Sequence, residues 1–289
     1  MDQLKLAGEL LPLAWRQAEI TRLPPDTEEI RLRVGKAPTY LRGGEERPIC
    51  RGTVTEEDLL RILEKATGAS MHTAAPSLAQ GYVSYRGLRI GVCGTGVSEN
   101  GKMIGLRSVS SLCVRISRAF PGICDEITRV LLNSDFSNML IIGSPGAGKT
   151  TVLRELIRAL SDAGRRVSVV DERNELAAYE GGKYSFDLGR CSDVLTGIPK
   201  DEGIVLLLRS MNPEILAVDE ITKPRDAEAV LQAFGCGVGL LASAHASKPD
   251  ELWKRPVYRE LLQAGVFPHC LCIHRKGIVR TYSLEKISV

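Results

Sequence analysis

Residues 138–151 read Asn-Met-Leu-Ile-Ile-Gly-Ser-Pro-Gly-Ala-Gly-Lys-Thr-Thr. The apolar run at 139–142 is typical of a strand buried on both faces. Residues 143–150 then match the phosphate-loop pattern G-x-x-x-x-G-K-[ST] at every position. A helical stripe follows, made of Val152, Leu153, Leu156, Ile157 and Leu160, and Gly164 is a suitable helix end. The strand, the complete motif and the amphipathic helix together predict a nucleotide-binding loop. A Gly-rich turn that matches the motif by chance would rarely lie between such a strand and such a helix.

The chemistry of this loop favours phosphate. Its glycines let the backbone curl until several N–H groups point at one centre, and the following helix adds the positive end of its dipole. We expect Lys149 to reach the β- and γ-phosphates of ATP and the Thr150 hydroxyl to hold Mg²⁺. The predicted nucleotide-binding residues are Gly143, Ser144, Pro145, Gly146, Ala147, Gly148, Lys149, Thr150 and Thr151.

The composition is that of a soluble globular protein. The 289 residues are 44% hydrophobic and 25% charged, enough for one large or two ordinary domains. The net charge of +3 is too small to indicate nucleic acid as the partner. The apolar runs fall far below the roughly 20 residues of a membrane helix, and Glu9 interrupts the N-terminal one. We therefore expect a cytoplasmic protein with no signal peptide and no transmembrane segment.

The eight cysteines are scattered, and beside an ATP motif they indicate reduced cytosolic thiols. One cluster, at 269–274, reads His-Cys-Leu-Cys-Ile-His. Its alternation predicts a strand with Cys270, Cys272 and His274 on one face. A metal site is the alternative, but the cluster has no second ligand pair at a zinc spacing.

The first 120 residues predict a smaller α+β domain. The expected helices cover residues 1–22, which carry Leu4, Leu10, Leu11 and Leu13, and residues 55–66, which open on a capping box. The expected strands are 29–34, 38–42, a hairpin at 81–96 that turns near Arg86-Gly87, and 112–116. Residues 121–136 are expected to be a linker with a helix at 125–132, and residues 137–289 a RecA-like P-loop domain of the α/β class.

Strands and helices alternate after the phosphate loop. The expected strands are 167–170, 215–218 and 239–242, and the expected helices are 202–209 and 224–234. This alternation is typical of a parallel sheet, which binds ligands beyond the carboxyl ends of its strands. Four polar clusters lie at those ends: the phosphate loop, residues 171–175, Asp219-Glu220 and His245. We expect them to converge on one site.

These clusters suit ATP hydrolysis. Asp219 follows an apolar strand as a Walker-B carboxylate does, so we expect it to hold Mg²⁺ together with Thr150. We expect the neighbouring Glu220 to orient or deprotonate the attacking water, which favours hydrolysis over transfer to a small acceptor. His245 could sense the γ-phosphate, or could be an ordinary polar strand end.

Two further groups of charged residues have alternative interpretations. Asp171, Glu172 and Glu175 could form a second acidic box near the metal, or simply the acidic first turn of a helix. An arginine reaching a neighbour's γ-phosphate would stabilise the transition state. The candidates are Arg107, Arg115, Arg118, Arg173 and Arg209, although any single arginine is more often an exposed surface charge.

The order of these motifs resembles that of the motor ATPases of type II secretion and type IV pili. The match includes Leu208-Arg209, Pro213, Glu220-Ile221 and Ser243-Ala244-His245, although those motors often have Gly where this chain has Asp219. The stage III sporulation protein AA family is a closer resemblance and covers nearly the whole chain. Its blocks are matched at residues 29–34, 80–83, 87–91, 109–116, 170–175, 193–197, 208–211 and 254–256. Leu88 departs from the histidine expected there, which weakens a nucleotide role for that hairpin.

The resemblance implies a homo-oligomeric, hexameric ATPase that docks at the inner face of a membrane. Its partners would be membrane proteins of the channel between mother cell and forespore, or of a secretion-like complex. It also implies that an N-terminal domain supplies Arg115 or Arg118 to a neighbour's nucleotide. We expect an Mg²⁺-dependent ATPase that does mechanical work. The alternatives are a nucleotide-gated assembly scaffold with little turnover, and a nucleic-acid-dependent ATPase, which would need a basic face with stacking aromatics.

Overall fold

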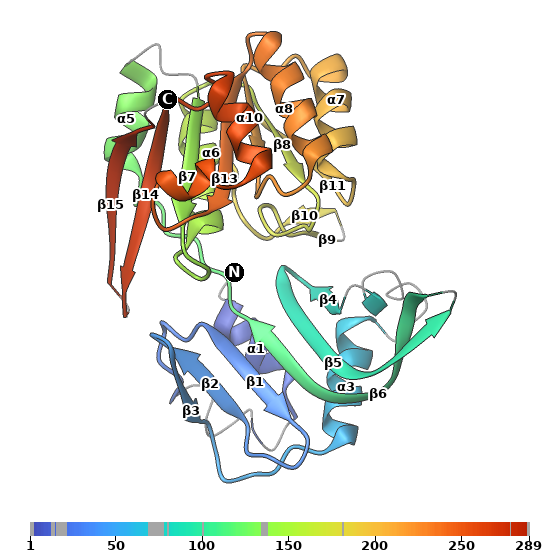
Figure 1. Cartoon of the computed structure of the whole chain (residues 1–289). Helices are drawn as coiled ribbons and strands as arrows, with labels where there is room; N and C mark the ends of the chain where they lie inside the picture. Colours follow the sequence, from blue (N-terminus) through green and yellow to red (C-terminus); the bar gives the residue numbers. More distant parts are fainter. Residues whose placement is uncertain are drawn as a thin grey trace. The chain divides into compact units, whose positions relative to one another are not determined.

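The computed structural model describes residues 3–12, 15, 22–68, 78–79, 81–99, 101–133, 138–180, 182–277 and 279–287. The chain divides into two compact units, Met1–Arg118 and Ala119–Val289. Each unit has its own sheet, and each is described by itself (Figure 1).

The first unit is an antiparallel sheet covered by helices. Its strand order is β3-β2-β1-β6-β5-β4. The strands are β1 (Glu29–Arg33), β2 (Thr39–Arg42), β3 (Glu45–Pro48), β4 (Tyr82–Tyr85), β5 (Leu88–Glu99) and β6 (Lys102–Arg115). Helices α1 (Gln3–Leu10) and α3 (Glu56–Ala66) bury their apolar faces against it, in a core that includes Leu6, Leu59, Ile30 and Leu112.

Local sequence explains much of this unit. Residues alternate along β1, with Ile30 and Leu32 fully buried and their neighbours half-buried. The Thr55 hydroxyl and the Asp58 carboxylate form the predicted capping box of α3. The turn between β4 and β5 uses two residues with positive φ, Arg86 at 47° and Gly87 at 84°, which suits the twist of a two-residue hairpin.

Two predictions for this unit need correction. The single helix expected over 1–22 is wrong in extent, because α1 ends at Leu10 and a bend follows at Leu11. Leu13 and residues 16–21 lie outside the described residues. The strand expected at 112–116 is the end of the much longer β6, whose pairing with β5 is broken by bulges. A Cβ added at Gly94 would lie 1.8 Å from the Ser108 carbonyl oxygen, so only glycine allows that close crossing.

The second unit is an α/β fold around a mostly parallel sheet. Within the described part of the chain its order is β11-β8-β12-β13-β7-β14-β15, and all neighbours are parallel except β14 and β15. The strands are β7 (Asn138–Gly143), β8 (Val167–Asp171), β11 (Ser192–Thr196), β12 (Ile215–Val218), β13 (Gly239–His245), β14 (His269–Lys276) and β15 (Val279–Lys286). A two-stranded ribbon, β9 (Tyr179–Glu180) and β10 (Lys183–Tyr184), stands apart from it.

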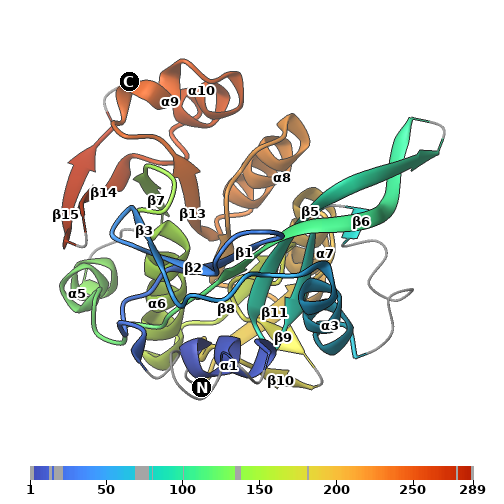
Figure 2. The ribbon, with the colours of Figure 1, turned by 90° about the horizontal axis from the view of Figure 1, so that it is seen from below.

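Helices cover both faces of this sheet (Figure 2). Because side chains alternate along a strand, Met139 and Ile141 of β7 face α5 (Asp125–Asn133) and α6 (Lys149–Asp162). Leu140 and Ile142 face the opposite layer. That layer contains α7 (Lys200–Ser210), α8 (Pro224–Gly235), α9 (Asp250–Trp253) and α10 (Pro256–Gln263). Covered on both sides, β7 is buried along its whole length, as its apolar run predicts.

The strand order determines where the functional candidates lie. Strand β13 separates β7 from β12, and the carboxyl ends of all three lie at one edge of the sheet. The strand predicted at 269–274 is confirmed as part of β14. There Cys270 and Cys272 are buried with their sulfur atoms 3.7 Å apart, and His274 is exposed. Among the described helices, none has both the length and the apolar character needed to cross a bilayer.

Candidate active site

The predicted phosphate loop connects β7 to α6 in a conformation that requires glycine. Gly146 has φ of +73° and Gly148 has φ of +106°, which side chains rarely tolerate. At Gly143, a Cβ would lie 3.1 Å from the Ala147 Cβ and 3.2 Å from the Ile273 carbonyl oxygen. The loop therefore holds a curled backbone against the first turn of α6, where free N–H groups accumulate. A phosphate group fits such a cradle.

Lys149 lies folded across this loop. Only 7% of the residue is exposed. Its Nζ donates to the carbonyl oxygens of Gly143 at 3.0 Å and Ser144 at 3.2 Å, and contacts His245 Nδ1 at 2.7 Å. Burial lowers the pKa of Lys149, while the charges of Asp219 and Glu220 oppose that shift. The ammonium group is thus held inside the cradle by neutral acceptors that a phosphate could replace.

The imidazole of His245 links Lys149 to Glu220. An ammonium group can only donate, so Nδ1 of His245 accepts from it and the ring proton resides on Nε2. That nitrogen lies 3.1 Å from Glu220 Oε1, at the right distance to donate. Burial, followed by the charge of Lys149, lowers the pKa of His245, while Glu220 opposes the shift. A neutral imidazole therefore joins the lysine of the loop to the carboxylate after β12.

Thr150 and Asp219 form the second link across the site. The Thr150 hydroxyl donates to Asp219 Oδ2 at 2.9 Å. Ser243 of β13 donates to Asp219 Oδ1 at 2.5 Å and accepts from the Glu220 backbone N–H at 3.1 Å. A hydroxyl and a carboxylate side by side, next to a phosphate cradle, are the hard oxygen ligands that Mg²⁺ combines with phosphate oxygens. These residues therefore fit the metal that the motif implies.

Glu220 has an unusual backbone. Its φ of +47° places it in the left-handed region, which costs a non-glycine residue about 1 kcal/mol or more. The conformation turns the carboxylate toward His245, and Arg173 Nη1 lies 3.9 Å from its other oxygen. The side chain is half-buried. A carboxylate held in this way can accept a proton from a water molecule in the cradle.

The carboxylates of Asp171 and Glu172, both in the predicted acidic box, lie in different environments. Asp171 is 2% exposed and accepts from the backbone N–H groups of Glu175, Leu176 and Ala177 at 2.8–3.0 Å. Burial raises the pKa of Asp171 to about 6, although the N–H groups of Ala177 and Leu176 oppose the shift. Asp171 therefore orders the loop that follows β8. The carbonyl of Glu175 accepts from the buried Arg154, which stacks on Phe186 and supports the same loop.

Glu172 is paired with two lysines. Lys200 Nζ lies 2.5 Å from its Oε2, and Lys223 Nζ lies 3.6 Å from its Oε1. Burial alone would raise the pKa of Glu172, but the hydrogen bond from Lys200 and the nearby charges hold that pKa below its usual value. Glu172 therefore connects the start of α7 to the start of α8.

The arginine candidates lie in different parts of the chain. Arg115 and Arg118 belong to the first unit, where Arg115 Nε lies 3.7 Å from Glu29 Oε1 and Arg118 donates to the Thr27 carbonyl. Arg107 is exposed on β6 of the same unit. Arg173 lies beside Glu220. Each guanidinium is thus placed by its own unit, and the site described above contains Arg173 alone among these candidates.

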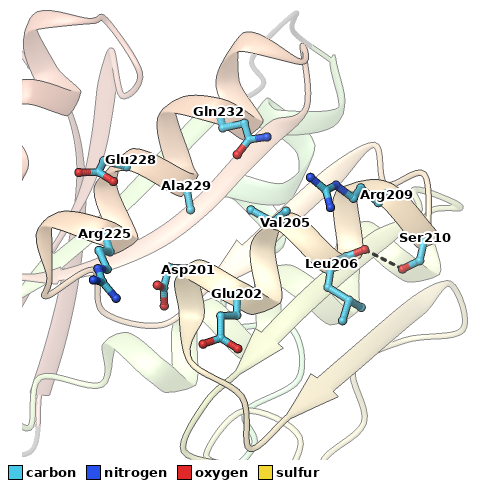
Figure 3. Close-up of a pocket in the computed structure, with 10 residues that line it drawn as sticks. All are labelled: Asp201, Glu202, Val205, Leu206, Arg209, Ser210, Arg225, Glu228, Ala229 and Gln232. Carbon is cyan, nitrogen blue, oxygen red and sulfur yellow. Dashed lines mark hydrogen bonds between the residues drawn. The ribbon is translucent and has the colours of Figure 1, made fainter.

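The remaining candidate, Arg209, lies away from these site residues. It lies in the last turn of α7, nine residues from Lys200, which corresponds to roughly 14 Å along a helix. There it lines a groove of about 790 Å³ between α7 and α8 (Figure 3). Val205, Leu206 and Ala229 are the apolar residues of its lining. Helices of a parallel sheet return to its amino edge, which explains the distance from the site.

Sequence reasoning missed three residues that touch the site. Ser243 was read as part of a strand end, and only the position of β13 between β7 and β12 reveals its role. Arg275 Nη1 donates to the Gly146 carbonyl at 2.8 Å, and Arg280 Nε donates to the Ala147 carbonyl at 2.9 Å. No spacing in the sequence indicates these contacts, because they depend on the pairing of β14 with β7.

Comparison with known proteins identifies the family of this chain. The family described as "Sporulation stage III, protein AA" matches residues 13–281. Stage III sporulation protein AA of Bacillus subtilis is 36% identical over 280 residues, which covers 93% of this chain and 90% of that protein. The protein SEEDLING PLASTID DEVELOPMENT 1 of Arabidopsis thaliana is 34% identical over 157 residues, covering 53% of this chain and 22% of that protein.

Solved structures of similar fold include an ATPase and a pilus retraction motor. The ATPase DotB of Legionella pneumophila superimposes with a TM-score of 0.60 at 16% identity, covering 90% of this chain and 76% of DotB. The pilus retraction motor PilT, solved with bound ADP, gives a TM-score of 0.60 at 15% identity, covering 100% of this chain and 84% of PilT. The fold is therefore an N-terminal α+β domain followed by a RecA-like core.

Proposed function

Since this chain belongs to the sporulation stage III protein AA family, we propose that it is an Mg²⁺-dependent ATPase that hydrolyses ATP to ADP and phosphate. One observation carries the proposal. Lys149, His245, Glu220, Ser243, Asp219 and Thr150 form a continuous hydrogen-bonded chain around a glycine cradle. That chain supplies a phosphate-binding lysine, oxygen ligands for a cation and a proton acceptor in one place.

Nucleotide binding uses the loop and the start of α6. The backbone N–H groups of the loop bind the phosphates, and Lys149 exchanges its bonds to Gly143 and Ser144 for phosphate oxygens. Thr150 and Asp219 would hold Mg²⁺, which when bound neutralises charge on the β- and γ-phosphates. Ser243 keeps one oxygen of Asp219 occupied, so the carboxylate is fixed with its other oxygen toward Thr150.

Hydrolysis uses the carboxylate of Glu220. Its oxygen accepts a proton from water as the water oxygen attacks the γ-phosphorus, and the bond from that phosphorus to the bridging oxygen breaks, leaving ADP. His245 donates to Glu220 through Nε2 and so fixes the carboxylate's orientation. Departure of Lys149 toward the γ-phosphate removes the donor from His245 Nδ1. Binding of the nucleotide in the phosphate loop thereby changes the hydrogen bonding of His245, which in turn contacts Glu220.

Membership of the family supports a proposal for the wider function. We propose a homo-oligomeric ring, a hexamer, in the cytoplasm, which docks on membrane proteins of the channel between mother cell and forespore and powers or assembles it. In that ring Arg115 or Arg118 would reach a neighbour's γ-phosphate. Residues 1–120, 121–136 and 137–289 are proposed as the N-terminal domain, the linker and the ATPase domain.

A pair of matched variants tests hydrolysis. Glu220 follows β12, and Glu214 precedes it at the opposite edge of the sheet, where it pairs with Arg165. Glu220→Gln should bind ATP with near wild-type affinity and release phosphate at least about 100-fold more slowly, since it lacks the proton acceptor. Glu214→Gln should retain the wild-type rate. Equal rates in both variants would contradict the proposal and favour a nucleotide-gated scaffold with little turnover.

A further inference from the structure

The strand pair β14–β15 carries two arginines directly to the phosphate loop. Strand β14 runs parallel to β7 and pairs Ile273 with Gly143, so it continues past the sheet edge just where the loop begins. Strand β15 returns antiparallel, with Arg280 directly opposite Arg275. The hairpin therefore projects beyond the edge of the sheet with both guanidinium groups beside the loop.

Both arginines donate to the outer side of the loop backbone. Arg275 binds the Gly146 carbonyl and Arg280 binds the Ala147 carbonyl, two consecutive acceptors. Each carbonyl shares a peptide plane with the next N–H group, which points the opposite way. A cation on the carbonyl fixes that plane and polarises its N–H. These contacts therefore orient the N–H groups of Ala147 and Gly148.

The glycines of the motif make room for these side chains. A Cβ on Gly146 would lie 3.1 Å from Arg275 Nη1, and a Cβ on Gly148 would lie 3.3 Å from Arg280 Nε. Arg275 also holds the hairpin turn, since its Nε donates to the Gly277 carbonyl at 2.9 Å. The turn and the loop are thus joined through a single half-buried side chain.

The placement of two arginines at one cross-strand position has a cost. Like charges directly opposite each other in an antiparallel pair are destabilising. A hairpin needs no such pair for its own stability, whereas an anion in the loop would be stabilised by both charges. The loop carbonyls hold the two guanidinium groups in place beside the loop.

We propose that Arg275 and Arg280 are positioning residues for the phosphates of a nucleoside di- or triphosphate, acting from outside the loop through the peptide planes of Gly146 and Ala147. The proposal rests on the nucleotide site proposed above. It makes the β14–β15 hairpin a part of the nucleotide-binding machinery, placed in the same chain as the loop that it orients.

The test measures binding of N-methylanthraniloyl-ADP with Mg²⁺ to the full chain by fluorescence. Arg275→Ala and Arg280→Ala should each raise the Kd roughly tenfold, as loss of a charged hydrogen bond predicts. Arg280→Lys, which keeps a cationic donor, should recover part of the affinity. Lys276→Ala removes the same charge from an exposed neighbour on the hairpin and should leave the Kd unchanged. When ATP hydrolysis is measured, the two alanine variants at Arg275 and Arg280 should have a higher KM for ATP and a nearly unchanged kcat.

Different outcomes separate the two proposals. Wild-type chain that does not bind the probe would overturn both. Wild-type binding with alanine variants that bind as Lys276→Ala does would overturn the role of the arginines and leave the site intact. Thermal unfolding without nucleotide supplies the structural control. If the unfolding temperature of the variants falls in proportion to their loss of affinity, Arg275 and Arg280 only stabilise the fold, and the proposal is overturned.

Discussion

At the scale of single residues, the site depends on one neutral imidazole. His245 accepts from Lys149 through Nδ1 and donates to Glu220 through Nε2. Protonation of the ring would place a second positive charge beside Lys149 and remove the acceptor of its hydrogen bond. The lowered pKa of His245 keeps the ring neutral at pH 7, because its protonation requires a pH below the ordinary value of 6.5.

The first prediction concerns pH. The rate of ATP hydrolysis should be flat above neutrality and fall on the acid side of pH 6.5, as His245 becomes protonated. In His245→Asn the rate should be lower throughout, and this acid limb should disappear, since asparagine does not titrate. Steady-state kinetics at constant ionic strength checks both. An unchanged acid limb in the variant would assign the titration to another group.

The second prediction concerns Lys149. Lys149→Ala should lower kcat/KM for ATP by roughly 100-fold or more, the order seen when one donor to a developing charge is removed. The fold should persist, because the lysine's partners are loop carbonyls and His245 rather than the apolar core. Circular dichroism and phosphate release report the two effects. Lys248→Ala, an exposed lysine three positions from His245, is the matched control and should behave as wild type.

The sequence predicts some residues of the site better than others. Lys149 and Thr150 follow from a motif whose spacing is local, and Asp219, Glu220 and His245 follow from apolar strands that end in polar residues. Ser243, Arg275 and Arg280 could not be predicted, because their contacts depend on which strands are neighbours. The order of strands is a property of the folded sheet, and no local pattern encodes it.

At the scale of elements, helix α7 depends on a glycine to approach the sheet. A Cβ on Gly203 would lie 2.7 Å from Val170 Cγ1, so the helix rests directly on β8. This contact sets the position of Lys200, which holds Glu172. Gly235, at the end of α8, is exposed, and a Cβ there would meet nothing within 4 Å.

The third prediction compares these two glycines. Gly203→Ala should lower the free energy of unfolding by about 1–3 kcal/mol, because the added methyl overpacks the contact with Val170. Gly235→Ala should be neutral or raise it by up to about 1 kcal/mol, through the better helix propensity of alanine. Urea denaturation of both variants measures these changes in the free energy of unfolding. Equal effects at the two positions would show that α7 can move away from β8 at no cost.

Elements were predicted well where the pattern was strong. The strand at 215–218 and the hairpin turn at Arg86-Gly87 were located correctly, because a bounded apolar run and a Gly-containing turn are local features. The early part of β6 and the whole of β15 were missed. Both are rich in polar or small residues and pair in long hairpins, so burial does not impose alternation on them.

At the scale of the whole molecule, the proposed transfer of arginines between chains gives the fourth prediction. Arg115→Ala/Arg118→Ala retains its own phosphate loop, and Lys149→Ala retains its arginines. Each variant alone should hydrolyse ATP very slowly. Loss of an arginine supplied in trans should reduce the rate roughly 1,000-fold relative to the wild type. A mixture of the two should recover part of the activity, measured as phosphate release. A mixture no faster than its components would place the functional arginine within the same chain.

The organisation of the whole chain was predictable in outline. The alternation of strands and helices after residue 138 indicated a parallel α/β core, and the earlier strands and helices indicated a smaller α+β unit, as the structure has them. The sequence places catalytic candidates in both units, with Arg115 in the first and Glu220 in the second. The contacts between units in an assembly could not be predicted, because they depend on surfaces that no local sequence pattern encodes.

The most direct test is the specific rate of ATP hydrolysis over a dilution series, with Glu220→Gln beside the wild type. We expect a wild-type rate per chain that rises with protein concentration, as an assembly with shared sites forms, and a variant rate that stays at background throughout. A slow rate that is independent of concentration and equal in the two proteins would contradict this expectation.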